Sequence, residues 1–206
     1  MAGLNKKSII TGGEVTKTFV KSGVSYYTCN DTGTIFCKAL DQSEKVGGIH
    51  EEGRNNEPDN LERVRRIKAI TGLGNPKVLD FGCGNGLFMR FMNANGCEAY
   101  GYDPFVPEFT ELKTGVDCVT LIEVVEHFSE PFGEFDVILS ALNQGGKVYI
   151  ETSFSDWINT KDSFYIEPSV GHCTIWSHKG LDYMMTKKGF KIEQPINRNV
   201  RVYSKP

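Results

Sequence analysis

The segment VLDFGCGNG, residues 78–86, places an acidic side chain, Asp80, ahead of glycines at positions 82, 84 and 86. A glycine-rich turn between a strand and a helix presents backbone N–H groups to a ligand at the carboxyl edge of a sheet. The G-x-G-x-x-G spacing of dinucleotide sites is missing because Leu87 occupies its last position, and no G-K-[ST] follows for a phosphate loop. A carboxylate at Asp80 repels phosphate and suits an ammonium group. The turn therefore favours a nucleoside that carries an amino acid, the alternative being a tight turn with no ligand.

A second acidic residue, Asp103, ends the apolar segment CEAYGYD about 20 residues beyond the glycines. At that position a carboxylate can accept hydrogen bonds from both hydroxyl groups of a ribose. Pro104 and Phe105 follow and could form an apolar wall against a purine. The alternative for Asp103 is a helix N-cap or a turn residue.

The elements that must position these residues alternate between strands and helices. A helix is expected from Asp59, with Glu62 completing a capping box, to about Gly72. Nearly continuous apolar strands between helices indicate a parallel sheet covered on both faces. The expected strands are 77–81, 97–103, 117–125, 147–154, 191–196 and 199–204, and the further helices are 86–96, 131–146 and 178–190.

The first 57 residues have a different character. The segments VSYYTC and TIFCKAL flank the turn-forming residues 30–33 and predict a hairpin, and residues 47–60 are typical of a loop. We therefore divide the chain into an N-terminal hairpin and loop region, residues 1–57, which is a lid or a degenerate ribbon, and a main domain, residues 58–206.

In four motifs the sequence resembles the class I S-adenosylmethionine-dependent methyltransferases: VLDFGCGNG, GYDPF, VTLIEVVEHF and LNQGGKVYIETSF. They occur in the family's order and near its spacing, within about residues 60–195, and are most similar to the small-molecule branch that includes ubiquinone-biosynthesis O-methyltransferases. The resemblance implies a Rossmann-like α/β fold with a mostly parallel seven-stranded sheet, its last strand antiparallel, and helices on both faces. Between Asp103 and VTLIEV, however, the chain is much shorter than the family's helix and strand.

The resemblance also implies a site for S-adenosylmethionine, with S-adenosylhomocysteine as the product. Carried over one by one, its residues are Arg63, Asp80, Gly82, Cys83, Gly84, Asp103, Pro104, Ile122 and Glu123. The glycine turn would pass beneath the methionine part, Asp80 would face its amino group and Asp103 would hold the ribose. Ile122 and Glu123 would contact the methionyl and sulfonium region. Arg63 would pair with the methionine carboxylate, or would lie on a solvated face like its neighbours Arg65 and Arg66.

Methyl transfer to a small-molecule acceptor, at oxygen, nitrogen or carbon, is the activity that the resemblance implies. A hydroxyl acceptor profits from a base, for which His172 and His127 are the candidates, with Glu123 and Glu126 as further ones. Trp157, Tyr165 and Trp176 could line a substrate pocket or belong to the core. The alternative is a non-catalytic S-adenosylmethionine-binding protein for regulation or assembly. An NAD-type oxidoreductase is disfavoured because the third glycine of its fingerprint is missing.

Composition limits the partners. The formal net charge of −3 gives no reason to expect a nucleic acid, and the Asn/Asp-Pro-Pro-aromatic motif of amino-group DNA methyltransferases is missing. The sequence starts without a secretory signal and contains no run of about 18 apolar residues, so we expect a cytoplasmic protein without a membrane segment, monomeric or homodimeric. Six irregularly spaced cysteines suggest reduced thiols. Cys29 and Cys37 lack a second pair, and His50 is a remote third ligand, so we expect no metal site.

Overall fold

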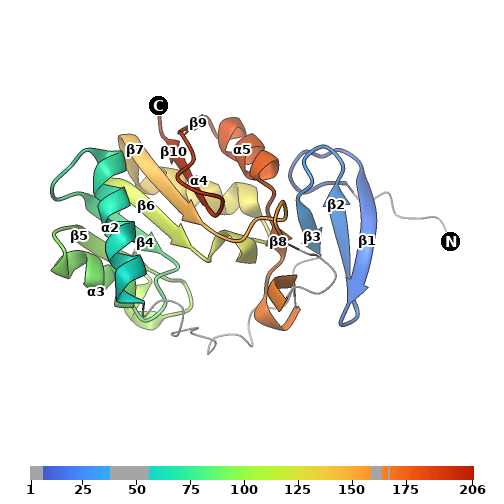
Figure 1. The fold of residues 1–206 in the computed structure, drawn as a ribbon, viewed down its shortest axis with the longest axis horizontal. Coiled ribbons are helices and arrows are strands. Elements are labelled where there is room, and N and C mark those ends of the chain that lie inside the picture. Colours follow the sequence, from blue (N-terminus) through green and yellow to red (C-terminus); the bar gives the residue numbers. More distant parts are fainter. Residues whose placement is uncertain (1–6, 38–55, 159–163, 167) are drawn as a thin grey trace.

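The computed structural model describes residues 7–37, 56–158, 164–166 and 168–206, which form two β-sheets. The larger sheet is flanked by helices (Figure 1). Its four strands β5, β4, β6 and β7 are parallel, and β10 runs antiparallel to β7. This is the Rossmann-like α/β arrangement that the sequence predicts. In spatial order the strands are β5 (Glu98–Tyr102), β4 (Lys77–Phe81), β6 (Val116–Ile122), β7 (Leu142–Glu151), β10 (Val200–Ser204) and β9 (Lys191–Ile192).

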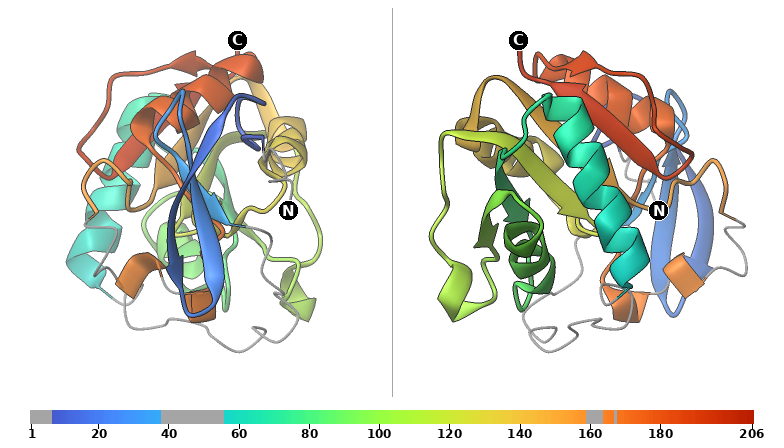
Figure 2. Two further views of the ribbon diagram at one scale, coloured as in Figure 1. Left: turned by 90° about the vertical axis from the view of Figure 1, so that its right-hand side faces the viewer. Right: turned by 60° about the vertical axis from the view of Figure 1, so that its left-hand side comes forward.

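Helices cover both faces of this sheet because consecutive strand residues point to opposite sides. Val78 and Tyr149 belong to a core under α2 and α3, whereas their neighbours Leu79 and Val148 belong to a core under α4 and α5. The right-hand view of Figure 2 shows α2 lying across the front of the strands. In the described part of the chain, no helix is long and apolar enough to cross a membrane. The helices are α2 (Glu57–Thr71), α3 (Leu87–Ala94), α4 (Pro131–Ala141) and α5 (His178–Lys187).

The ends of α2 follow the sequence in part. The helix stops where we expect it, because Gly72 adopts a left-handed conformation (φ 69°) and donates its N–H to the carbonyl of Lys68. The predicted capping box of Asp59 and Glu62 is wrong. The helix begins two residues earlier, after Asn56, because Pro58 fits the first turn, where its missing N–H costs nothing.

Other elements differ from expectation as well. The strand β6 ends at Ile122 and not at residue 125, because Glu123 has a positive φ of 52°. The larger sheet has six strands among the described residues instead of seven, because the short connection from β5 to β6 holds only the 3-10 turn η1 (Pro107–Phe109). The helix α4 gives way to β7 at Leu142, earlier than predicted. The strand β9 is only two residues long, and Pro195, which lacks an N–H, could not have extended its hydrogen bonding.

The N-terminal residues build the second sheet, drawn in blue at the right of Figure 1. The predicted hairpin is confirmed, since β2 and β3 pair antiparallel. A strand from a distant part of the chain, β8, completes this sheet beside β3. Ser177, the N-cap of α5, also donates a hydrogen bond to the carbonyl of Thr32 at 2.6 Å. The predicted loop at 47–60 lies mostly outside the described residues. The strands are β1 (Val15–Lys21), β2 (Val24–Cys29), β3 (Ile35–Cys37) and β8 (Thr174–Ile175).

Candidate functional site

The glycine turn joins β4 to α3 at the carboxyl edge of the larger sheet. Gly82, Gly84 and Gly86 all have positive φ angles, of 74°, 55° and 77°, which other residues rarely adopt. The N–H groups of Gly82 and Cys83 donate to the carbonyl of Tyr102 at 2.7 and 3.1 Å. These bonds tie the turn to the end of the neighbouring strand β5.

Asp103 lies against this turn. Its Oδ2 accepts a hydrogen bond from the N–H of Gly84 at 2.9 Å, and its Oδ1 accepts one from the N–H of Phe105 at 3.0 Å. The side chain therefore organises the glycine turn and its own turn together. Pro104 and Phe105 are exposed beside it, and the ring of Phe105 is 53% accessible. The structure thus brings the predicted ribose and adenine residues to one end of the site.

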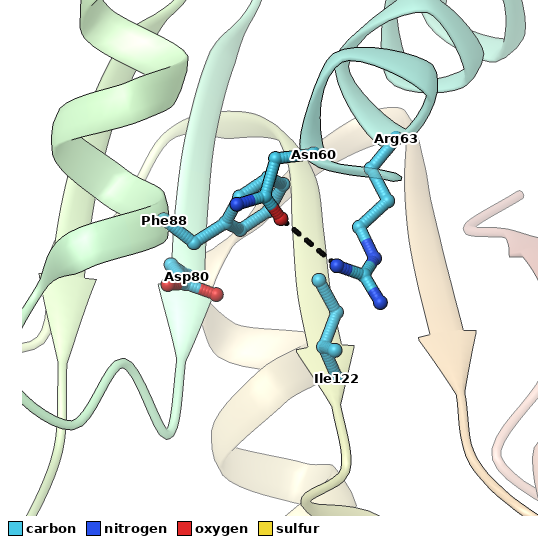
Figure 3. Close-up of a pocket in the computed structure, with 5 residues that line it drawn as sticks. All are labelled: Asn60, Arg63, Asp80, Phe88 and Ile122. Carbon is cyan, nitrogen blue, oxygen red and sulfur yellow. Dashed lines mark hydrogen bonds between the residues drawn. The ribbon is translucent and has the colours of Figure 1, made fainter. Parts of the chain in front are cut away.

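Five side chains line a small recess next to the turn (Figure 3). Asn60 and Arg63 reach into it from α2, while Asp80 and Ile122 enter from the ends of β4 and β6. Phe88, from α3, completes the lining. Asp80 is 2% exposed, and its Oδ1 accepts a hydrogen bond from the Thr120 hydroxyl at 3.0 Å. Cationic, amide and carboxylate groups therefore face one space.

Arg63 is not on a solvated face, which was the alternative for this residue. Its side chain is 12% exposed, and its Nη2 donates to Glu151 Oε1 at 2.5 Å. A further bond from Nη1 reaches Asn60 Oδ1 at 2.8 Å. Burial alone would lower the pKa of Arg63, but Glu151 outweighs burial and holds it above its ordinary value. A charged guanidinium is thus fixed at the rim of the pocket.

We expect Glu151→Gln to lower the free energy of unfolding by about 2 kcal/mol, because it leaves a largely buried guanidinium without its anionic partner. Urea denaturation measures the change. The matched control is Glu62→Gln, which removes the partner of Arg66 on the same helix, where the side chains are 26% and 47% exposed. That change should stay within about 0.5 kcal/mol. Equal losses for the two variants would contradict a structural role for the Arg63–Glu151 pair.

The two candidate histidines meet beyond the ends of β6 and β7. His127 belongs to the turn η2 (Val125–His127), and His172 follows η4 (Pro168–Val170). Their rings are 4.7 Å apart in an edge-to-face arrangement. The ring of His172 also contacts that of Tyr165, from η3 (Phe164–Ile166), at 4.3 Å.

Two glutamates accompany these histidines. Glu126 is fully buried and accepts a hydrogen bond from the Thr152 hydroxyl at 2.9 Å. Glu123 has a positive φ of 52°, an uncommon backbone conformation for a residue other than glycine. Desolvation, followed by the charges of Glu126 and Glu151, raises the pKa of Glu123 above its ordinary value. The site thus gathers two carboxyl groups close to two imidazoles.

The remaining predicted residues lie apart. Trp176 is fully buried and donates its Nε1–H to the carbonyl of Val125 at 2.9 Å, so it belongs to the core. Trp157 is 63% exposed. Cys29 contacts the Thr11 hydroxyl, whereas Cys37 bonds through its N–H to the carbonyl of Cys173. These two thiols have separate surroundings, and His50 lies outside the described residues.

Sequence reasoning missed part of the site. Asn60, Phe88 and Glu151 carry no motif of their own. Asn60 was recognisable only as a polar residue one helical turn before Arg63, on the same face of α2. The partnership of Arg63 with Glu151 spans 88 positions and becomes visible only in the fold.

A family model described as a methyltransferase domain matches residues 47–194. The ubiquinone biosynthesis O-methyltransferase of Pseudomonas savastanoi pv. phaseolicola is 28% identical over 134 residues, which are 53% of this chain and 56% of that protein. The tRNA U34 carboxymethyltransferase of Campylobacter hominis is 30% identical over 115 residues, or 44% and 40% of the two chains. The chain thus spans about half the length of the curated relatives it matches.

Solved structures share the fold. The 1,6-didemethyltoxoflavin-N1-methyltransferase of Burkholderia thailandensis aligns with a TM-score of 0.59 at 13% identity, over 92% of this chain and 98% of that one. An amino pentose methyltransferase of Micromonospora echinaspora aligns with a TM-score of 0.55 at 14% identity, over 76% and 95%. With the family match and the motifs in place, the chain belongs to the class I S-adenosylmethionine-dependent methyltransferases.

Proposed function

We propose that this protein transfers a methyl group from S-adenosylmethionine to a small-molecule acceptor that carries a protic nucleophile, a hydroxyl in the first place. The observation that carries the proposal is the pocket in which Asn60, Arg63 and Asp80 face one another next to the glycine turn. Two histidines at the carboxyl ends of the adjacent strands supply basic groups.

The residues of the pocket suit the methionine part of the donor. An amino acid carries a carboxylate and an ammonium group, and Arg63 with Asn60 can bind the first while Asp80 binds the second. Ile122 and Phe88 offer apolar contact to the methylene chain between them. Gly82, Cys83 and Gly84 would then border the ligand, Asp103 would hold the ribose and Pro104 would lie against the base. Glu123 would stand near the sulfur.

The chemistry needs little from the protein beyond alignment and a proton acceptor. S-adenosylmethionine supplies a methyl group on a sulfonium, which is reactive without further activation. The protein fixes the acceptor close to that methyl group, which lowers the barrier by restricting its motion. When the acceptor is a hydroxyl, its proton passes to Nε2 of His172 and the electron pair stays on oxygen. His127 lies edge-to-face beside the ring of His172.

The names of similar proteins support a small acceptor, since they refer to ubiquinone biosynthesis, to 1,6-didemethyltoxoflavin and to an amino pentose. The similarity to a tRNA-modifying enzyme concerns 44% of this chain. The net charge of −3 speaks against a nucleic acid as the acceptor. A screen of methyl release from labelled S-adenosylmethionine against hydroxylated, carboxylated and glycosylated metabolites, with tRNA included, tests the acceptor class.

Binding of S-adenosylhomocysteine tests the donor site directly. We expect Asp103→Ala to weaken it at least tenfold, about 1.4 kcal/mol, because the variant loses the ribose contact and the hydrogen bond that orders Gly84. Isothermal titration calorimetry measures the dissociation constant. The control is Asp117→Ala, whose carboxylate bonds the N–H of Lys77 at the opposite end of β4. No binding by the wild-type protein would overturn the proposed function.

A further inference from the structure

Both imidazoles at the site are held in a defined protonation form by backbone carbonyl groups. Nδ1 of His127 lies 3.2 Å from the carbonyl oxygen of Gly171, and Nδ1 of His172 lies 2.7 Å from that of Tyr165. A carbonyl oxygen can only accept a hydrogen bond, so each Nδ1 carries a hydrogen. In the neutral form, Nε2 is therefore the atom of each ring that takes up a proton.

A buried carboxylate approaches these rings. Glu126 is 0% exposed, and its Oε2 accepts the hydrogen bond from Thr152. Its Oε1 lies 4.0 Å from Nε2 of His172. One nitrogen or oxygen atom from each of Glu126, His127 and His172 lies within 4.8 Å of the other two. Three proton-accepting groups thus converge, and the carboxylate of Glu126 would attract a proton on Nε2 of His172.

We propose that Glu126 is a positioning residue that stabilises the protonated form of His172 and so makes His172 the base of the methyl transfer. The inference rests on the proposed function, because it names the group that sets the basicity of that site. Glu126 acts through the imidazole, since it is fully buried and its other oxygen is occupied by Thr152.

The other titratable groups around His172 strengthen the part played by Glu126. Desolvation, and then the charges of the nearby glutamates, raise the pKa of Tyr165, so its hydroxyl stays neutral. The pKa of Glu123 is raised in the same direction, although that residue is exposed. Burial likewise raises the pKa of Glu134, to about 7. Three titratable side chains lie beside His172, namely Glu126, His127 and Tyr165. Glu123 interacts with Glu126 and Tyr165. Glu134 on α4 and Cys37 on β3 lie near Cys173, the next residue in the chain.

The proposal predicts a titration that can be measured on the protein alone. Histidine-labelled protein, treated with a chelator, is followed by NMR across pH, and His172→Gln assigns the signal. In the wild type we expect the midpoint of His172 to lie above about 6.5, the ordinary value for histidine. Glu126→Gln should lower that midpoint by about one pH unit or more, because the stabilising charge is gone. Once an acceptor is known, kcat/KM can be measured against pH. The midpoint of its rising part should shift to lower pH in Glu126→Gln by the same amount as the NMR midpoint.

Glu130→Gln is the matched control, since it removes an exposed carboxylate from the same connection and should leave the midpoint unchanged. A wild-type midpoint below that of ordinary histidine, or no shift in Glu126→Gln, overturns the proposal. A midpoint that depends on the chelator also overturns it, because a cation would then take the place of the proton. If Glu126→Gln does not fold, the wild-type midpoint decides by itself. The NMR midpoints are measured without methyl transfer, so they separate this inference from the proposed function.

Discussion

His172→Gln should lower kcat for methyl transfer to a hydroxyl acceptor by about 10²- to 10⁴-fold, the usual contribution of a positioned base. Glutamine keeps a side chain of similar length that can still donate toward the Tyr165 carbonyl, but it cannot take up the proton at Nε2. Binding of S-adenosylhomocysteine should change little, because the described ring contacts of His172 are with His127 and Tyr165, which do not line the pocket beside the glycine turn. Steady-state kinetics with the acceptor found by the methyl-release screen provides the measurement.

The control for this variant is His178→Gln. That imidazole, at the start of α5, packs against the ring of Phe154 at a tilted angle and lies within hydrogen-bond distance of the carbonyl of Arg198. Its replacement should leave kcat within about twofold of the wild-type value. If His172→Gln retains full activity while its donor binding is intact, the acceptor needs no base, as with an ionised carboxylate or a thiolate.

Gly82→Ala should cost about 3 kcal/mol of folding free energy and weaken donor binding as well. The left-handed backbone at Gly82 accounts for about 1–2 kcal/mol of that loss. The rest arises because a Cβ atom would lie 2.6 Å from Cγ2 of Val124, so the turn must shift. Urea denaturation and calorimetry with S-adenosylhomocysteine measure the two effects on the same samples.

The chain offers a control that separates backbone strain from steric contact. Gly145 has the same φ of 74°, but a Cβ there would meet nothing within 4 Å. Gly145→Ala should therefore show the strain alone and leave donor binding unchanged. Adding Val124→Ala to Gly82→Ala should recover part of the loss. Equal destabilisation by the two single alanine variants would show that close approach at Val124 plays no role.

The parts of the fold that the sequence predicts depend on local patterns. The strand KVLDF is found at the predicted residues because it carries apolar side chains on both faces. The glycines after it form a turn, and their positive φ angles explain why glycine occupies these positions. Asp103 shows the limit of such reasoning. Its place beside the glycine turn follows from two parallel strands that end together. The sequence offered two alternatives for Asp103, binding a ribose or stabilising a turn, and the hydrogen bond from the N–H of Gly84 shows that the side chain also stabilises the turn.

Other features depend on contacts between distant segments and leave little trace in local sequence. The strand β8 that pairs with β3 consists of only two residues, Thr174 and Ile175, too few to show a strand period. The strand β1, in contrast, could have been predicted from local sequence. Ser22 and Gly23 form the positive-φ turn of the hairpin between β1 and β2, and a Ser-Gly pair is typical of such a turn. The charge pair of Arg63 and Glu151 needs the completed sheet.

The strand order β1-β2-β3-β8 has a consequence for the synthesis of the protein. Thr34 and its partner Ser177 are 143 residues apart, and at about 5–20 residues per second the ribosome needs on the order of ten seconds to produce that stretch. During this time the nascent hairpin exposes the edge of β3, with Ile35 and Phe36, which are buried in the finished molecule. Open apolar edges of this kind invite pairing with other chains. Yield in the cell should therefore depend on translation speed and on chaperones that shield the emerging hairpin.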